Sequence, residues 1–161
     1  MNRTHSIPAQ GNPEHNSFIM NPRLLFLAIC LFAVVVSDAQ NAANVDNTPY
    51  KIVFQLTSGD TTIQHALVKQ LNNALTAAPK SQIEVVCHNQ GISFLVTAKT
   101  QQAEKIRELK AKGVVFAACE NTMRDRKIKR EELLPEAITV PAGIIEIVKK
   151  QRKHWAYIKA G

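Results

Sequence analysis

The residue best suited to chemistry is Cys119, which ends the apolar stretch 114–119 and enters the turn Glu120-Asn121-Thr122-Met123. The nucleophilic form of cysteine is the thiolate, which is stabilised by a helix N-terminus or by nearby cations. A helix that begins directly after Cys119 would therefore favour the thiolate, whereas the carboxylate of Glu120 opposes it. Cysteine is also a common buried apolar residue. The residue type alone therefore leaves a reactive and an inert Cys119 both open.

A second cysteine, Cys87, lies next to His88 at the end of another apolar run. This pairing suggests a base-activated nucleophile, but adjacent residues on a strand point to opposite faces. We therefore interpret Cys87 as a core residue and His88 as a structural hydrogen-bond partner or part of a pocket lining. If the two strands that end in cysteine are neighbours, Cys87 and Cys119 could come close enough to form a disulfide.

The remaining constellations are less specific. The turn from Ser58 to Thr62 could hold an anion through its backbone N–H groups, or it could cap a helix, which the absence of a P-loop lysine favours. One His and two Cys are too few for a structural zinc site, and we expect no metal and no cofactor. A basic cluster is either a solvated face or a contact for an anionic partner or another subunit; its members are Arg124, Arg126, Lys127, Lys129 and Arg130.

The elements that must position these residues alternate along the chain. Apolar runs predict strands, and apolar residues at spacings of three and four predict helices. Strands without polar alternation imply a parallel sheet that is covered on both faces. We therefore predict a three-layer α/β/α sandwich with a mostly parallel five-stranded sheet. The expected strands are 51–57, 82–87, 114–119, 137–140 and 155–158, and the expected helices occupy 61–78, 92–96, 100–113, part of 120–134 and the segment from 143 onward.

Two details of this pattern can be tested. Ser58 or Asp60 should cap the first long helix, and Thr100 should cap the helix before Gly113. The last helix should carry its apolar residues inward, namely Ile144, Ile147 and Val148. In parallel sheets, ligands lie beyond the carboxyl ends of the strands. The loops 58–61, 87–91, 119–123 and 141–143 are therefore the expected location of any site.

The first 39 residues differ from the rest. Met20 to Arg23 forms a short basic start, 24–36 is an unbroken apolar run, and small residues precede Gln40. This pattern is typical of a cleaved secretory signal, and the run is short for a spanning helix. The alternatives are a core helix or an uncleaved anchor. We predict a signal peptide over 1–39, with Met20 as an alternative start of translation, a linker over 40–49 and one domain over 50–161, exported to the periplasm without a stable membrane anchor.

The net charge is +7 for the whole chain, and it remains +7 without the first 39 residues because these hold two basic and two acidic residues. A protein of this charge attracts anions and acidic surfaces. Nucleic acid would be the usual partner, but export argues against it, and we expect none.

Several segments together resemble the DsrE/DsrF-like family, in its small exported branch. They are Gln55-Leu56-Thr57-Ser58-Gly59, the stretch 85–92 (VVCHNQGI), the stretch 113–123 (GVVFAACENTM), the stretch 140–144 (VPAGI) and the stretch 151–158. The resemblance covers nearly all of 50–159, and Gly-Val-x-Phe-x-x-Cys-x-Asn-Thr-Met is its most specific part.

The resemblance implies a parallel five-stranded fold that commonly assembles as a homotrimer or homohexamer. Some members act in sulfur relay and carry a persulfide on a strand-end cysteine, a position that Cys119 matches. Two features differ from the relay members, namely the leader and Cys87, where similar proteins often have a small residue. The resemblance therefore extends to Cys119 but not to a role in tRNA modification.

Two hypotheses follow. In the first, Cys119 of an exported homo-oligomer handles sulfur or thiol redox chemistry with a donor or acceptor protein. The loop residues His88, Gly91, Asn121, Thr122 and Ser58 would then line the binding site. In the second, the protein is a non-catalytic module whose loops and basic cluster bind an anion or an anionic partner. Whether the domain is an enzyme stays open at this point.

Overall fold

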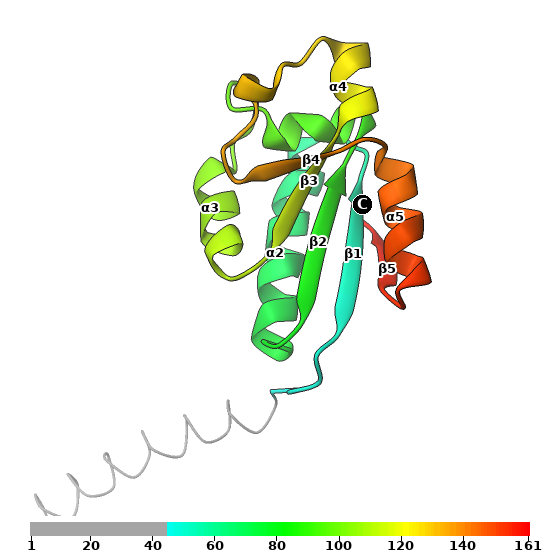
Figure 1. The fold of residues 1–161 in the computed structure, drawn as a ribbon. Helices are drawn as coiled ribbons and strands as arrows, with labels where there is room; N and C mark the ends of the chain where they lie inside the picture. Colours follow the sequence, from blue (N-terminus) through cyan, green and yellow to red (C-terminus); the bar gives the residue numbers. More distant parts are fainter. Residues whose placement is uncertain (1–44) are drawn as a thin grey trace, which may run out of the picture. The chain divides into compact units, whose positions relative to one another are not determined.

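The computed structural model describes residues 45–161, and the predicted signal peptide lies outside this part of the chain. Five strands form one parallel sheet in the order β4-β3-β2-β1-β5 (Figure 1). All four strand pairs are parallel. The predicted α/β sandwich with five parallel strands is therefore confirmed. The strands are β1 (Lys51–Leu56), β2 (Gln82–Cys87), β3 (Val115–Cys119), β4 (Ala137–Val140) and β5 (Ala156–Lys159).

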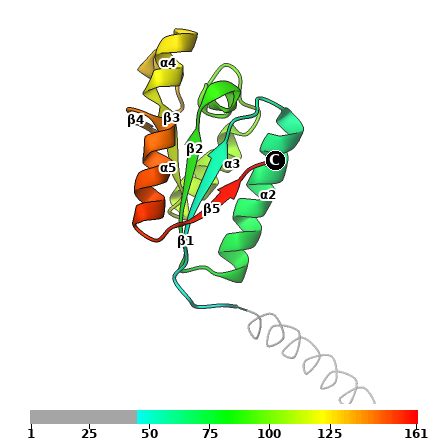
Figure 2. The same ribbon diagram turned by 90° about the vertical axis from the view of Figure 1, so that its right-hand side faces the viewer.

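The order of the strands determines which face each helix covers. The chain steps in one direction from β1 to β4 and then returns past three strands to β5. Because parallel crossovers are right-handed, the return connection lies on the opposite face from the others. Helices α2 (Thr61–Ala77) and α3 (Ala103–Ala111) accordingly cover one face, and α5 (Gly143–Arg152) alone covers the other (Figure 2).

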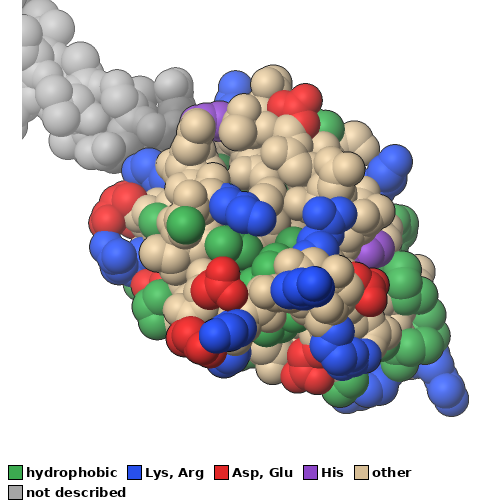
Figure 3. Space-filling model, turned by 90° about the horizontal axis from the view of Figure 1, so that it is seen from above, with side chains coloured by type: hydrophobic (Ala, Val, Ile, Leu, Met, Phe, Trp, Pro, Cys, Tyr) green, Lys and Arg blue, Asp and Glu red, His purple; other side chains and the backbone are tan. Residues whose placement is uncertain are grey.

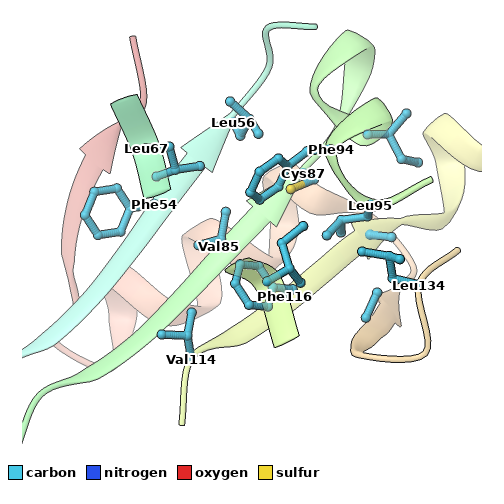
Figure 4. Close-up of a cluster of buried hydrophobic side chains, with 14 of the residues drawn as sticks. Phe54, Leu56, Leu67, Val85, Cys87, Phe94, Leu95, Val114, Phe116 and Leu134 are labelled. Atoms are coloured by element: carbon cyan, nitrogen blue, oxygen red, sulfur yellow. The ribbon is translucent and has the colours of Figure 1, made fainter. Parts of the chain in front are cut away.

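The main core lies between the sheet and the α2–α3 layer. Phe94 and Phe116 meet there with ring centroids 6.2 Å apart, and Leu67 and Leu71 of α2 are buried against the strands. Phe94 belongs to a 3₁₀ helix, η1 (Asn89–Leu95). The sequence predicted a loop over 88–91 and a helix from Ile92, so the helical segment starts earlier and is tighter than expected. The sulfur of Cys87 points into this cluster beside Phe94 (Figure 4).

The second face has a smaller core, and here one prediction is wrong. Ile147 of α5 is buried as expected, but Ile144 is 55% exposed and Val148 is 44% exposed. The helix has two adjacent apolar stripes, one through Gly143 and Ile147 and one through Ile144 and Val148. A periodicity of 3.6 residues fits either stripe, and the close approach of Gly143 to the sheet selects the first.

Local signals explain most of the element boundaries. Asp60 is the N-cap of α2, and its Oδ1 accepts a hydrogen bond from the Thr62 N–H at 2.7 Å. Ser58, the other predicted cap, does not cap the helix. Its Oγ accepts a hydrogen bond from the Asp60 N–H and supports the preceding turn. Thr100 does not cap α3 directly; its Oγ1 accepts from the N–H of Gln102, which precedes the helix. No helix among residues 45–161 is long and apolar enough to span a bilayer.

A buried ion pair fastens α5 to the sheet. Glu84 of β2 is 2% exposed, and its Oε2 accepts a hydrogen bond from Nζ of Lys150. The same Nζ lies 4.5 Å from the ring centroid of Trp155. Burial raises the pKa of Glu84, although Lys150 acts against this. Lys150 therefore offsets part of the cost of burying the charged form of Glu84.

We expect Lys150→Met to destabilise the fold by about 3 kcal/mol at neutral pH, because it leaves a buried carboxyl without its partner. Without the ammonium, the folded-state pKa of Glu84 rises further above its unfolded value. The unfolded chain then loses its proton first, so stability declines as pH rises between the two pKa values. Urea unfolding at acidic and neutral pH measures this. The free energy of unfolding of a Glu84→Gln/Lys150→Met double variant should not show this decline with pH. An equal decline in the single and the double variant would exclude Glu84 as its cause.

Candidate functional site

Cys119 lies where β3 passes directly into helix α4 (Glu120–Arg126). The helix that the sequence analysis required after Cys119 therefore exists. The residue is 5% exposed, and its Sγ accepts a hydrogen bond from the Gly143 N–H at 3.1 Å. Since Gly143 is the first residue of α5, the sulfur lies where the beginnings of two helices meet.

The surroundings of the sulfur favour its negative charge. Burial raises the pKa of Cys119, but the nearby N–H groups of Thr122, Gly143 and Asn121 and the Thr122 hydroxyl lower it, and the net effect is a pKa below that of an ordinary thiol. Hydrogen bonds to a charged acceptor are stronger than those to a neutral one. The site therefore binds a sulfur anion better than a neutral thiol.

Gly143 approaches the sheet more closely than other residue types would allow. A Cβ atom at this position would lie 3.2 Å from the Cβ of Cys119, 3.2 Å from Cγ1 of Val86 and 3.4 Å from the Cβ of His88. A side chain would therefore crowd Cys119, Val86 and His88, so that the start of α5 or these neighbours must shift slightly. The same geometry places His88 and Cys119 beside each other on the α5 face of the sheet.

His88 is held by a chain of hydrogen bonds that crosses three strands. Its Nε2 lies 2.7 Å from Nε2 of Gln55 on β1, and the Gln55 Oε1 is hydrogen-bonded to the hydroxyl of Tyr157 on β5. If the Gln55 amide donates to His88, the imidazole proton resides on Nδ1. Burial lowers the pKa of His88. The ring is thus a neutral, oriented group beside Cys119.

A polar pocket of about 510 Å³ opens at this edge, lined by His88, Asn89, Thr122, Asp125 and Arg126. Thr122 joins it to the sulfur, because its Oγ1 also accepts a hydrogen bond from the Asn89 N–H at 3.1 Å. Arg126 donates to Oδ1 of Asn89 at 3.2 Å. Of the residues expected to form the site, His88 and Thr122 therefore line one pocket next to Cys119.

The other expected residues occupy different places. The backbone N–H of Asn121 helps to lower the pKa of Cys119, while the Asn121 side chain accepts a hydrogen bond from Arg124. Gly91 packs on the end of β1, where a Cβ would lie 2.2 Å from the Leu56 carbonyl oxygen. Ser58 belongs to the turn before α2. Neither Gly91 nor Ser58 lines the pocket beside Cys119.

Cys87 is separated from this site by the sheet. It is fully buried in the main core, and burial raises its pKa strongly. Both cysteines of the described part are free thiols. Cys87 pairs in register with Ala118, so Cys87 and Cys119 come from neighbouring strands but face opposite sides. The disulfide that the sequence left open is not formed.

The contacts that sequence reasoning missed all depend on the fold. Gly143, Gln55 and Tyr157 are distant from Cys119 in the chain, and no local pattern joins them to it. The sequence signals were that 141–143 follows a strand and that all three residues lie in segments that resemble the DsrE/DsrF-like family, and neither signal indicates the contacts. Within residues 45–161, no three His, Cys, Asp or Glu side chains lie together so as to hold a metal ion.

These features define a class of protein: a parallel α/β domain with a hydrogen-bonded thiol at the carboxyl end of an interior strand. The model of the DsrE/DsrF-like family matches residues 50–160, and the chain belongs to this family. Among solved structures, it is similar to MTH1491, a protein of unknown function from Methanobacterium thermoautotrophicum. The two share 30% identity and a TM-score of 0.66, over 68% of this chain and 98% of the other. No curated protein matches the chain.

We predict that Gly143→Ala raises the pKa of Cys119 by displacing the amide donor at the start of α5. A hydrogen bond to a charged group contributes about 1.5–3 kcal/mol, so alkylation by iodoacetamide at neutral pH should slow by about tenfold. The pH dependence of the alkylation rate measures the pKa directly. Gly113→Ala is the matched control, because Gly113 has φ +94° in open space and its replacement strains the backbone far from the sulfur. Equal rate profiles for wild type and Gly143→Ala would contradict the proposed role of the amide.

Proposed function

We propose that this DsrE-like protein carries sulfur on Cys119. The observation that carries the proposal is the sulfur's set of N–H and O–H donors, which lowers its pKa although the residue is buried. Membership of the DsrE/DsrF-like family, which is associated with sulfur relay, supports the same chemistry. Cys87 is excluded as the carrier, because its thiol is enclosed in the core and its pKa is raised.

The proposed sulfur transfer from a persulfide donor to Cys119 involves no net oxidation or reduction. The Cys119 thiolate attacks the outer sulfur of a persulfide, R–S–SH. The S–S bond of the donor breaks while a new S–S bond to Cys119 forms, and R–S⁻ leaves as a thiolate. Cys119 then holds a persulfide, and transfer to an acceptor thiolate reverses the same exchange. No external oxidant or reductant is required.

The neighbouring residues have distinct parts in this proposal. The amide of Gly143 and the groups of Thr122 stabilise the Cys119 thiolate, both when it attacks the donor and when it is released as the outer sulfur passes to the acceptor. The polar pocket beside Cys119 gives a small donor or the end of a partner's chain a route to the sulfur. His88, kept neutral by burial, can take the proton from the newly formed persulfide on Cys119 and pass it to the leaving thiolate.

The compartment determines which other thiol reactions compete with sulfur transfer at Cys119. We propose a periplasmic location, where disulfides form readily. Because Cys87, the other cysteine of residues 45–161, faces the other side of the sheet, any disulfide of Cys119 must use a thiol outside this part of the chain. Mixed disulfides with a partner are therefore the expected side products.

Sulfur transfer to Cys119 should leave a covalent adduct that can be weighed. Incubation with a low-molecular-weight persulfide should add one sulfur atom per chain, seen by intact mass spectrometry under denaturing conditions. Cys119→Ser should abolish the adduct, and Cys87→Ala should retain it. Equal adducts on wild type and Cys119→Ser, or none on wild type, would overturn the proposal.

We further propose that the protein is a homo-oligomer that uses the exposed stripe of α5. Ile144, Ile145 and Val148 are each more than 40% exposed, and Ile138 and Tyr157 on the edge strands are similarly exposed. The helix α5 alone covers this face of the sheet (Figure 2); the central strands beneath it are buried, whereas these edge-strand residues stay exposed. Apolar surfaces of this kind commonly mark contacts between proteins, and a second copy of the chain would bury them.

The corresponding prediction is that Ile144→Glu/Ile145→Glu converts an oligomer into a monomer, because it places two charges in the buried contact. Light scattering coupled to size exclusion gives the mass. Gln70→Glu, on the exposed side of α2, serves as the control and should keep the wild-type mass. A wild-type protein that is monomeric at micromolar concentration would contradict this assembly.

A further inference from the structure

A second pocket, of about 530 Å³, lies between α4, the segment that follows it and strand β4. Its residues are Glu120, Met123, Arg124, Lys127, Ile128, Lys129, Arg130 and Thr139. Met123 and Ile128 form its apolar floor and belong to the main hydrophobic core, where each is 8% exposed. The pocket is thus a place where the core reaches the surface at an edge of the sheet.

Four cations surround this floor. Arg124 and Lys127 come from α4 and its C-terminal cap, and Lys129 and Arg130 come from the next turn. None of the four takes part in a salt bridge among residues 45–161; only Arg124 and Arg130 have side-chain hydrogen bonds, to Asn121 and to the Ala137 carbonyl. Glu120 is the single acidic residue of the lining. Lys and Arg side chains lie among hydrophobic and acidic ones across this end of the molecule (Figure 3).

This combination limits the type of ligand. A bare inorganic anion would leave the apolar floor in water, and an uncharged hydrocarbon would leave four cations without a counter-ion. Small-molecule pockets typically measure a few hundred Å³, with apolar walls and a few charged groups that orient the ligand. The dimensions suit one small molecule better than a long peptide segment.

We propose that this pocket binds an amphiphilic organic anion, with a carboxylate, sulfonate or phosphate head and an apolar body. The head lies among Lys127, Lys129 and the free N–H groups of Arg124 and Arg130, and the body lies on Met123 and Ile128. The pocket is distinct from the one beside Cys119, which takes Thr122, Asp125 and Arg126 from α4. The site therefore does not depend on sulfur transfer, and Cys119→Ser should leave it intact.

The probe is anilinonaphthalene sulfonate, compared with N-phenylnaphthylamine, which has the same aromatic body without the charge. Fluorescence titration of the full chain should show saturable binding of the sulfonate. Lys127→Gln/Lys129→Gln should weaken the sulfonate about tenfold and leave the uncharged probe unchanged. Thr139→Phe, which fills the pocket from β4, should weaken both probes. The matched charge control is Lys149→Gln/Lys153→Gln on the far side of α5, where affinity should not change.

Competition separates the head group from the body. A medium-chain alkyl sulfonate should displace the probe at a concentration at least about tenfold lower than inorganic sulfate. Equal displacement by the two would show that the apolar floor contributes nothing and would overturn the proposal. Two other results would also overturn it: wild-type affinity in Thr139→Phe, which would place the probe elsewhere, and an equal loss in the control pair, which would indicate net charge alone.

Discussion

The contact between the Gly143 amide and the Cys119 sulfur is the interaction on which the rest of the site depends. The sulfur is nearly enclosed, and burial by itself would keep it protonated. The amide at 3.1 Å, together with the donors at the start of α4, reverses that tendency. The absence of a Cβ at residue 143 makes the short approach possible. A buried cysteine thereby becomes an anion site.

This contact is a consequence of the sheet topology. Strands β1 to β4 follow one another across the sheet, and the connection from β4 to β5 returns on the other face. The start of α5 must therefore pass over the carboxyl end of β3, next to β4. Ligand sites in open α/β sheets lie where successive connections leave to opposite faces. The ion pair between Glu84 and Lys150 holds the other part of α5 against the same face.

The sequence predicted the sheet, all five strand positions to within one residue and a short helix within 120–134, because apolar runs and turn residues are local signals. It did not predict which stripe of α5 meets the sheet, since Ile144 and Ile147 are equally apolar and only the strand packing distinguishes them. It also could not join Gln55, Tyr157 and His88, which three strands bring together. The spacing of residues along the chain does not indicate contacts that depend on the order of the strands.

The central claim is that hydrogen bonds stabilise the Cys119 thiolate inside the protein. The most direct measurement is an ultraviolet titration of the thiolate in Cys87→Ala, where Cys119 is the only thiol of the domain. The account predicts a pKa below that of an ordinary cysteine thiol, with the folded state intact throughout the titration. A pKa at or above the ordinary value would show that burial prevails over the hydrogen bonds and would contradict the account.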